Sequence, residues 1–212
     1  GINSEHERTT KAVNATRGEI ASYNDEVIDA VFSSNSGGYS ESSLDVWASY
    51  NPYLKGANNM TEGNLKFPLE PYQLDDWLKN RYSSFSDSKY SGTSSYRWIK
   101  LIPASYIIDK YDLDQLKNVV PLKRSKGGSV SSLLIKGKEK KIYINRDYIR
   151  SALGGLRSNR FVIDKFIKDN NIYKLIFYGG GFGHNVGLDQ TASASMADNG
   201  YNYNEIIMHF YS

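Results

Sequence analysis

A histidine follows a glycine cluster near the C-terminus, where it could bind a ligand or transfer a proton. His184 comes directly after Gly183, and the cluster 179–183 itself follows an apolar stretch, 173–178. Glycines at this density permit tight turns and close approach of the backbone to another group. An imidazole changes its charge near neutral pH, so this position could supply acid, base or hydrogen-bond chemistry. A plain turn between a strand and a helix is equally compatible with the local pattern.

The glycine cluster does not match the loops that bind phosphate groups. It lacks the Lys-Ser/Thr ending of one class and the glycine spacing of the dinucleotide-binding class. His6 lies between two glutamates, as on an exposed helix face, and His209 lies beside apolar residues, as expected for a packed, hydrogen-bonded histidine. Because the three histidines are widely scattered, the sequence predicts no zinc site. The absence of a Gly-x-Ser-x-Gly elbow disfavours a Ser-His-acid hydrolase.

A second polar cluster lies far upstream, at residues 33–41. It places four serine hydroxyls, one amide and the carboxylate of Glu41 around Gly37 and Gly38. The pattern alone favours an ordinary polar turn. Hydroxyls and amides of this kind can also hydrogen-bond the hydroxyl and acetamido groups of a sugar. Glu41 could then bind sugar, orient a neighbouring residue or cap the loop.

Composition restricts the classes of partner. The 212 residues suffice for one large domain, and the formal net charge of +3 is too small to predict nucleic-acid binding. The chain has 17 Tyr, 8 Phe and 3 Trp, whose rings suit contact with sugars. With no cysteine, disulfides and thiolate metal sites are excluded. The sequence has neither an apolar run of membrane-spanning length nor a signal-peptide pattern at its first residues.

Local patterns predict strands and short helices in mixed order, which is an α+β fold around one groove. Residues 83–95 are serine-rich without apolar periodicity, and we expect an exposed, flexible loop there. We expect the glycine-bearing loops 36–38 and 183–184 to lie close together, because each follows an apolar strand. The expected helices are 5–17 with Ser4 as N-cap, one opened by Pro71, 103–117, one from Asn145 to Gly154, one from 189 or 190 to Gly200, and one capped by Asn204. The expected strands are 19–23 and 26–32 around an Asn24-Asp25 turn, 129–135, 141–144 and 172–178.

Three ordered blocks of sequence resemble the SpoIID/LytB family, which contains the stage II sporulation protein D and the amidase enhancers. The C-terminal block is Gly183-His184 to Gln190, continued by Ala194, Met196-Ala197, Gly200-Tyr201, Tyr203, 205–207 and 209–211. The upstream block is Phe32 to Glu41 around Ser36-Gly37-Gly38, followed by Val46-Trp47 and Pro52-Tyr53-Leu54. The middle block is Ile149-Arg150 and 153–158, ending at Phe161. The chain differs from the family at Asn185, Leu188 and Asp189, where Gly, Met and Ser are usual, and at Ser33, where many members have histidine.

The resemblance implies that the chain takes part in cleavage of peptidoglycan glycan strands by a lytic transglycosylase. Such an enzyme needs a carboxylic acid to protonate the leaving oxygen, best held with a raised pKa in a partly apolar cleft. The family's catalytic glutamate lies on a helix in an Ala-Arg-Thr-Tyr context, where some relatives also have a zinc site, and neither segment occurs in these 212 residues. We therefore expect the C-terminal part of a longer protein, incomplete at its N-terminus and nearly inactive alone. Glu41 and Asp189 lie beside the candidate site outside that context, so no catalytic residue is assigned and Glu41 stays a candidate.

The resemblance also implies one domain over 1–212 with a glycan-binding site and no metal or cofactor. Expected partners are peptidoglycan glycan strands, together with the missing N-terminal segment or a cell-wall amidase, and the expected location is outside the cytoplasm, in the cell wall or intermembrane space. Two functions stay open: the substrate-binding body of a lytic transglycosylase in sporulation, and a non-catalytic cell-wall-binding or amidase-enhancing module. The expected glycan-binding residues are Ser34, Ser36, Gly37, Gly38, Glu41, His184 and Gln190.

Overall fold

The computed structural model describes residues 6–47, 49–63, 65–146 and 148–212. The chain forms two compact units, Gly1–Ala30 and Val31–Ser212. The second unit mixes helices with small open sheets, so the predicted α+β class is confirmed. A single domain over 1–212 stays a prediction.

The first unit contains a short exposed helix, α1 (Glu7–Ala15). The helix begins after His6, whose Nδ1 accepts a hydrogen bond from the backbone N–H of Arg8 at 3.2 Å and so satisfies one free donor of the first turn. The predicted N-cap, Ser4, lies outside the described residues.

The same unit contains the predicted hairpin, with shorter strands than expected. β1 (Ser22–Tyr23) pairs antiparallel with β2 (Glu26–Val27). Asn24 and Asp25 both have positive φ angles, 51° and 65°, which a two-residue hairpin turn requires, so the predicted tight turn is confirmed. The predicted strand 26–32 is wrong beyond Val27. Residues 28–31 belong to no strand, and Phe32 begins a separate two-residue strand.

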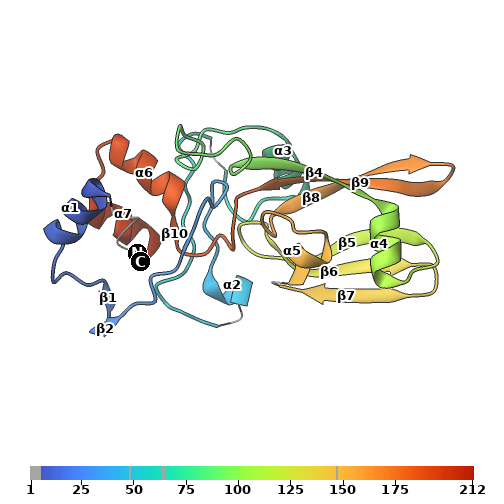
Figure 1. Cartoon of the computed structure of the whole chain (residues 1–212), viewed down its shortest axis with the longest axis horizontal. Coiled ribbons are helices and arrows are strands. Elements are labelled where there is room, and N and C mark those ends of the chain that lie inside the picture. Colours follow the sequence, from blue (N-terminus) through green and yellow to red (C-terminus); the bar gives the residue numbers. More distant parts are fainter. Residues whose placement is uncertain (1–5, 48, 64, 147) are drawn as a thin grey trace. The chain divides into compact units, whose positions relative to one another are not determined.

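Two three-stranded antiparallel sheets form the body of the second unit (Figure 1). One has the order β4-β9-β8 and the other the order β5-β6-β7. The predicted strands 129–135, 141–144 and 172–178 are confirmed as parts of β6, β7 and β9, with small differences at their ends. The bounds are β4 Arg97–Pro103, β5 Leu116–Arg124, β6 Val130–Gly137, β7 Lys141–Asn145, β8 Phe161–Lys168 and β9 Asn171–Gly180.

One apolar core joins these sheets to two helices, α4 (Ala104–Tyr111) and α5 (Tyr148–Ala152). The chain passes from β4 through α4 into β5, so this helix connects the two sheets at one end (Figure 1). Alternate residues of β6 and β9 face the core, as the period of two in a strand requires. Its fully buried members include Ile107, Leu133, Ile135, Ile149, Phe161, Leu175 and Phe177.

A smaller apolar cluster lies under α3 (Pro71–Lys79). The helix predicted to open at Pro71 is confirmed, and Leu74, Trp77 and Leu78 are buried as their helical spacing indicates. These side chains pack with Tyr39 of the upstream polar loop and Val162 of β8, so the cluster joins the loop to β8.

The predicted helix 103–117 is wrong beyond Tyr111. Asp112 has a left-handed conformation with φ 49° and ends α4, and Leu116 begins β5, where it is buried. The sequence pattern does not predict β5, because irregular register near Asn118 and Lys123 interrupts the alternation of apolar and polar residues. It does not predict β4 or β8 either.

Two predicted helix caps are also wrong. Asn145 is the last residue of β7 and does not cap α5. The last helix, α7 (Tyr203–Phe210), is capped by Asn202 and not by Asn204. Asn202 accepts from the backbone N–H of Glu205 at 3.0 Å, and the Glu205 carboxylate accepts from the N–H of Asn202 at 2.8 Å, which completes a capping box.

Residues 83–95 contain no helix or regular strand, as the serine-rich composition predicts. The expectation that this loop is exposed is wrong for Ser84 and Ser86, which are buried. Their hydroxyls are used inside the fold: Ser84 donates to the carbonyl of Asn59 at 2.7 Å, and Ser86 donates to Asp189 at 2.7 Å.

The two glycine-bearing loops lie together, as the sequence predicts. β3 (Phe32–Ser33) pairs in parallel with β10 (Leu188–Asp189). Just beyond, Asn35 and Phe182 exchange backbone hydrogen bonds of 3.3 and 2.7 Å. Gly37 lies so close to the other loop that a Cβ on it would be 2.6 Å from the backbone nitrogen of Gly181.

Replacing Gly37 with alanine should therefore destabilise the fold more than the same change at Gly200. Both have positive φ, 68° and 90°, and both variants carry a left-handed strain of about 1–2 kcal/mol. Only at Gly37 would the added Cβ also clash with backbone atoms, because a Cβ on Gly200 meets nothing within 4 Å. The clash should add about 1–3 kcal/mol to the loss in unfolding free energy, measured by urea denaturation. Equal losses for the two variants would show that the loops are not packed as described.

Candidate functional site

A buried ion pair joins the upstream polar loop to the start of β8. Arg160 Nη2 lies 2.6 Å from Glu41 Oε1, and both side chains are 0% exposed. The Glu41 carboxylate also accepts hydrogen bonds from the backbone N–H groups of Gly127 at 3.1 Å and Ser129 at 3.2 Å. The carboxylate is thus paired and hydrogen-bonded on both oxygens, as a buried charge requires.

The burial of Glu41 decides what it can do in this structure. Its carboxylate has no exposed surface for a sugar, and its partners hold it against the backbone. Of its three expected roles, the geometry supports two: Glu41 orients the neighbouring Arg160 and holds the loop against the turn at Gly127 and Ser129. Arg160 extends this role, because it also donates to the carbonyls of Tyr39 at 2.8 Å and Ser36.

A second buried carboxylate, Asp189, ties the two loops together. Its Oδ2 accepts hydrogen bonds from the Ser36 N–H, the Ser36 hydroxyl and the Ser86 hydroxyl, each at 2.7 Å. Its Oδ1 accepts from the N–H of Ala192 at 2.9 Å and caps α6 (Gln190–Asp198), at the start that the sequence predicts. The positive end of the helix dipole favours a carboxylate there.

A chain of hydrogen bonds continues from this carboxylate to the last helix. The Asn59 amide donates to the Ser36 hydroxyl at 2.8 Å, and its oxygen lies 2.8 Å from Nε2 of His209. That amide oxygen must accept, so Nε2 of His209 carries the proton. Burial lowers the pKa of His209 below its ordinary value of 6.5, which favours the neutral ring. His209 is thus the packed, hydrogen-bonded histidine that the sequence predicts.

His184 is half-buried, beside the end of α2 (Ser43–Trp47). Its ring centroid is 5.0 Å from that of Trp47, and its Nδ1 accepts from the N–H of Val186 at 3.0 Å. In the neutral ring, Nε2 therefore carries the proton. Asn185 next to it has φ 65°, a conformation that asparagine tolerates better than most residues, which explains how it can replace the glycine usual in the resembling family.

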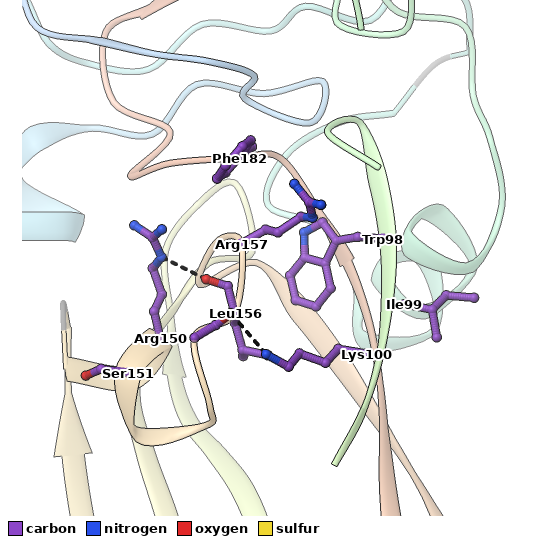
Figure 2. A pocket seen from close by; sticks show the side chains of 9 residues that line it. Trp98, Ile99, Lys100, Arg150, Ser151, Leu156, Arg157 and Phe182 are labelled. Atoms are coloured by element: carbon purple, nitrogen blue, oxygen red, sulfur yellow. Dashed lines mark hydrogen bonds between the residues drawn. The ribbon is translucent and has the colours of Figure 1, made fainter. Parts of the chain in front are cut away.

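His184 lines the smallest of three hollows that adjoin through shared lining residues, and we refer to the three together as the groove. The basic pocket, of about 650 Å³, is lined by Trp98, Lys100, Arg150, Arg157 and Phe182 among others. The histidine cleft, of about 20 Å³, shares Arg150 with it and contains Asp45, Arg146 and His184. The outer hollow, of about 550 Å³, shares Asp45 and Arg146 with the cleft and adds Lys123. Figure 2 shows the basic pocket, with Arg150 and Arg157 both extending toward the side where Phe182 lies.

The structure separates the predicted site residues into three groups. His184 lines the groove. Ser36, Gly37, Gly38 and Glu41 are buried in the contact between the loops. Ser34 and Gln190 are exposed but line none of the three hollows.

The groove contains residues to which the sequence pattern assigns no role. Arg150 and Arg157 occur in the block 149–158, so the family resemblance marks their segment, but no local pattern indicates that they share a pocket with Lys100 and Phe182. Across the described ranges, no group of three His, Asp or Glu is arranged to hold a metal ion. Nor is any described helix both long and apolar enough to cross a membrane.

Replacing Glu41 with glutamine should strongly destabilise the fold, because it leaves the fully buried Arg160 without a counter-charge. We expect a loss of about 3–5 kcal/mol in the free energy of unfolding, measured by urea denaturation. Asp198→Asn breaks the ion pair with Lys89 at the surface, 2.7 Å in length, and is the matched control that should change stability little. A Glu41→Gln variant as stable as the control would contradict the structural role given to this pair.

A family model described as domain of unknown function (DUF8618) matches residues 41–187, which is more than half of the chain. The amidase enhancer of Bacillus subtilis (strain 168) is 27% identical over 226 residues, or 96% of this chain and 32% of that protein. The stage II sporulation proteins D of Bacillus amyloliquefaciens and Bacillus subtilis (strain 168) are each 29% identical over 204 residues, or 96% of this chain and 49% of those proteins. The chain thus spans at most about half the length of these relatives. It belongs to the DUF8618 family, and its predicted membership of the SpoIID/LytB-like proteins is confirmed.

Proposed function

We propose that the chain is the glycan-binding body of a protein that acts on the peptidoglycan of the cell wall during sporulation, and that the groove past His184 holds the glycan strand. The names of its relatives, stage II sporulation protein D and amidase enhancer, support a cell-wall role in sporulation. The single observation that carries the proposal is that two hollows of about 650 and 550 Å³ adjoin the small cleft at His184 through shared lining residues, which offers places for sugar units on both sides of this histidine. The proposed location is accordingly outside the cytoplasm.

The lining of the groove suits a polysaccharide. Phe182 is 38% exposed at one end, and Trp47 lies against His184 near the middle, so aromatic rings are available to pack on the apolar faces of pyranose rings. The guanidinium groups of Arg146 and Arg150, beside His184, can donate hydrogen bonds to hydroxyl and acetamido oxygens.

The reaction we propose for the whole protein is lytic transglycosylation, with this chain as the part that binds substrate. Cleavage needs a carboxylic acid at the scissile bond. Among the described residues that line the groove, Asp45 is the acidic one, and its carboxylate accepts from the hydroxyl of Ser42 at 2.9 Å near the start of α2. We assign binding to this chain and place the catalytic acid elsewhere in the longer protein.

The burial of Glu41 also favours a second candidate function, a non-catalytic module that binds the wall or modulates a cell-wall amidase. A carboxylate that is fully buried and paired cannot reach a glycosidic oxygen to protonate it. The relative named amidase enhancer matches over 96% of this chain. Both candidates require glycan binding in the groove, and they differ in whether bonds are cleaved.

Binding should depend on the groove aromatics and not on exposed aromatics elsewhere. We expect titration with chitin oligomers to show millimolar binding that chelator does not change. Phe182→Ala should weaken binding roughly threefold to tenfold. Tyr72→Ala, which removes a 73% exposed ring from α3, should leave it unchanged. Undetectable binding by the unmodified chain, or equal effects of the two substitutions, would contradict the proposal.

Incubation of this chain alone with purified glycan strands should release no anhydro-muramyl products, as judged by mass spectrometry of the digest. General acid catalysis commonly supplies about two to four orders of magnitude in rate, and we place the catalytic acid outside this chain. Asp45 is the one acidic residue among the described residues that line the groove, so it is the candidate to test. If such products do form and Asp45→Asn abolishes them, the chain is itself the enzyme and Asp45 is its acid. Restored cleavage in the longer protein favours the transglycosylase, and continued inactivity there favours the amidase-modulating module.

A further inference from the structure

The basic pocket gathers three cationic side chains from two elements and a loop. Lys100 comes from β4, Arg150 from α5, and Arg157 from the segment that leads to β8. Within the part of the chain that the structure describes, no ion pair involves any of the three. Asp45, which lines the neighbouring histidine cleft, does not line this pocket. The binding of a neutral glycan gives no reason for this concentration of positive charge.

Each cation is held in place by the fold. Arg150 donates through Nε to the carbonyl of Leu156 at 3.0 Å, which fixes the guanidinium and leaves its two terminal nitrogens for another acceptor. Lys100 Nζ donates to the carbonyl of Gly155 at 3.1 Å and to that of Gly154. The guanidinium carbon of Arg157 lies 4.9 Å from the ring centroid of Phe182. A site fixed before binding loses less side-chain entropy when an anion enters.

We infer that the basic pocket is a subsite for a carboxylate carried by the glycan strand, recognised by Arg150 and Arg157 with Lys100 adding positive charge. The inference rests on the proposed function. The planar guanidinium presents paired donors that match the two oxygens of a carboxylate, and the partly exposed ring of Phe182 can pack on the sugar that carries it. Muramic acid residues of peptidoglycan supply carboxylates along the strand, whereas chitin supplies none.

The carboxylate has two possible sources with the same chemistry. One is the lactyl group attached directly to the sugar, free where no peptide is linked to it. The other is the terminus or side chain of a stem peptide. Three ligands of equal glycan length separate these sources: a chitin oligomer, a peptide-free peptidoglycan fragment, and the same fragment with its peptides attached.

The experiment measures the affinity of the 212-residue chain for each ligand at low and high salt. Arg150→Gln and Arg157→Gln are the test variants, and Arg146→Gln is the matched control, since Arg146 lines the two neighbouring hollows and not this pocket. The Arg157 side chain makes no hydrogen bond within the described part of the chain, so Arg157→Gln tests the site even if loss of the Arg150 bond to Leu156 disturbs α5. Thermal unfolding of each variant shows whether it has folded.

We expect a carboxylated fragment to bind roughly tenfold more tightly than the chitin oligomer at low salt, and this advantage to shrink as salt rises. Arg150→Gln and Arg157→Gln should both remove the advantage, and Arg146→Gln should preserve it. Arg157→Gln should leave chitin binding unchanged, whereas Arg150→Gln should also weaken it, because Arg150 lines the histidine cleft as well. Preference for the peptide-free fragment identifies the lactyl source, and preference for the peptide-bearing fragment identifies the peptide source.

Equal affinity for all three ligands would overturn the carboxylate subsite and leave the proposed function standing. Failure of every ligand to bind would overturn both. A phosphodiester wall polymer that binds more tightly than any glycan, with the same two arginines required, would also overturn the assignment of a carboxylate.

Discussion

The ion pair between Arg160 and Glu41 is the constraint on which the centre of the second unit depends. Its two side chains are fully buried, so each charge must be matched by fixed partners within the protein. Arg160 meets this need with the Glu41 carboxylate and the carbonyls of Tyr39 and Ser36, and Glu41 adds the N–H groups of Gly127 and Ser129. The pair therefore fixes the backbone course of the upstream loop against β8 and the turn before β6. Neither segment could move away without leaving a buried charge unpaired.

Ser36 links this pair to the other buried charge, Asp189. Its N–H and hydroxyl donate to the Asp189 carboxylate, while its carbonyl accepts from Arg160. No ion pair between Asp189 and a described cation is present, so hydroxyls, backbone N–H groups and the N-terminus of α6 stabilise its charge. One residue thus connects the loop, β8 and the C-terminal helices through polar bonds shielded from water. The hydroxyls of Ser36 and Ser86 satisfy this carboxylate, whereas Nε of Arg160 is buried without a hydrogen-bond partner among the described residues.

The elements that the sequence predicts are those with strong local signals. α3 combines Pro71 at its first position with apolar residues at helical spacing, and the β6–β7 hairpin and β9 have clear apolar patterns. β5 is missed because its register is irregular, and α4 is overextended because nothing local shows that Asp112 turns into the left-handed region. The meeting of the two loops is predictable from their glycines. The partner of Glu41 is not, because Arg160 lies 119 positions away and no short-range pattern pairs them.

A resemblance in sequence identifies the family of this chain more readily than its ligand. The upstream block of the resemblance, including Ser36, Gly37, Gly38 and Glu41, is mostly buried in the contact between the loops, where geometry and charge leave few alternatives. The groove lies beside this buried network, and its surface is built by Phe182, Arg157, Lys100 and residues near α2 and α5. Side chains at the surface can change without unpairing a buried charge. At 27–29% identity, chains can therefore share a fold while presenting different groove surfaces to a ligand. The ligand of this chain must then be argued from the charge and shape of its own groove.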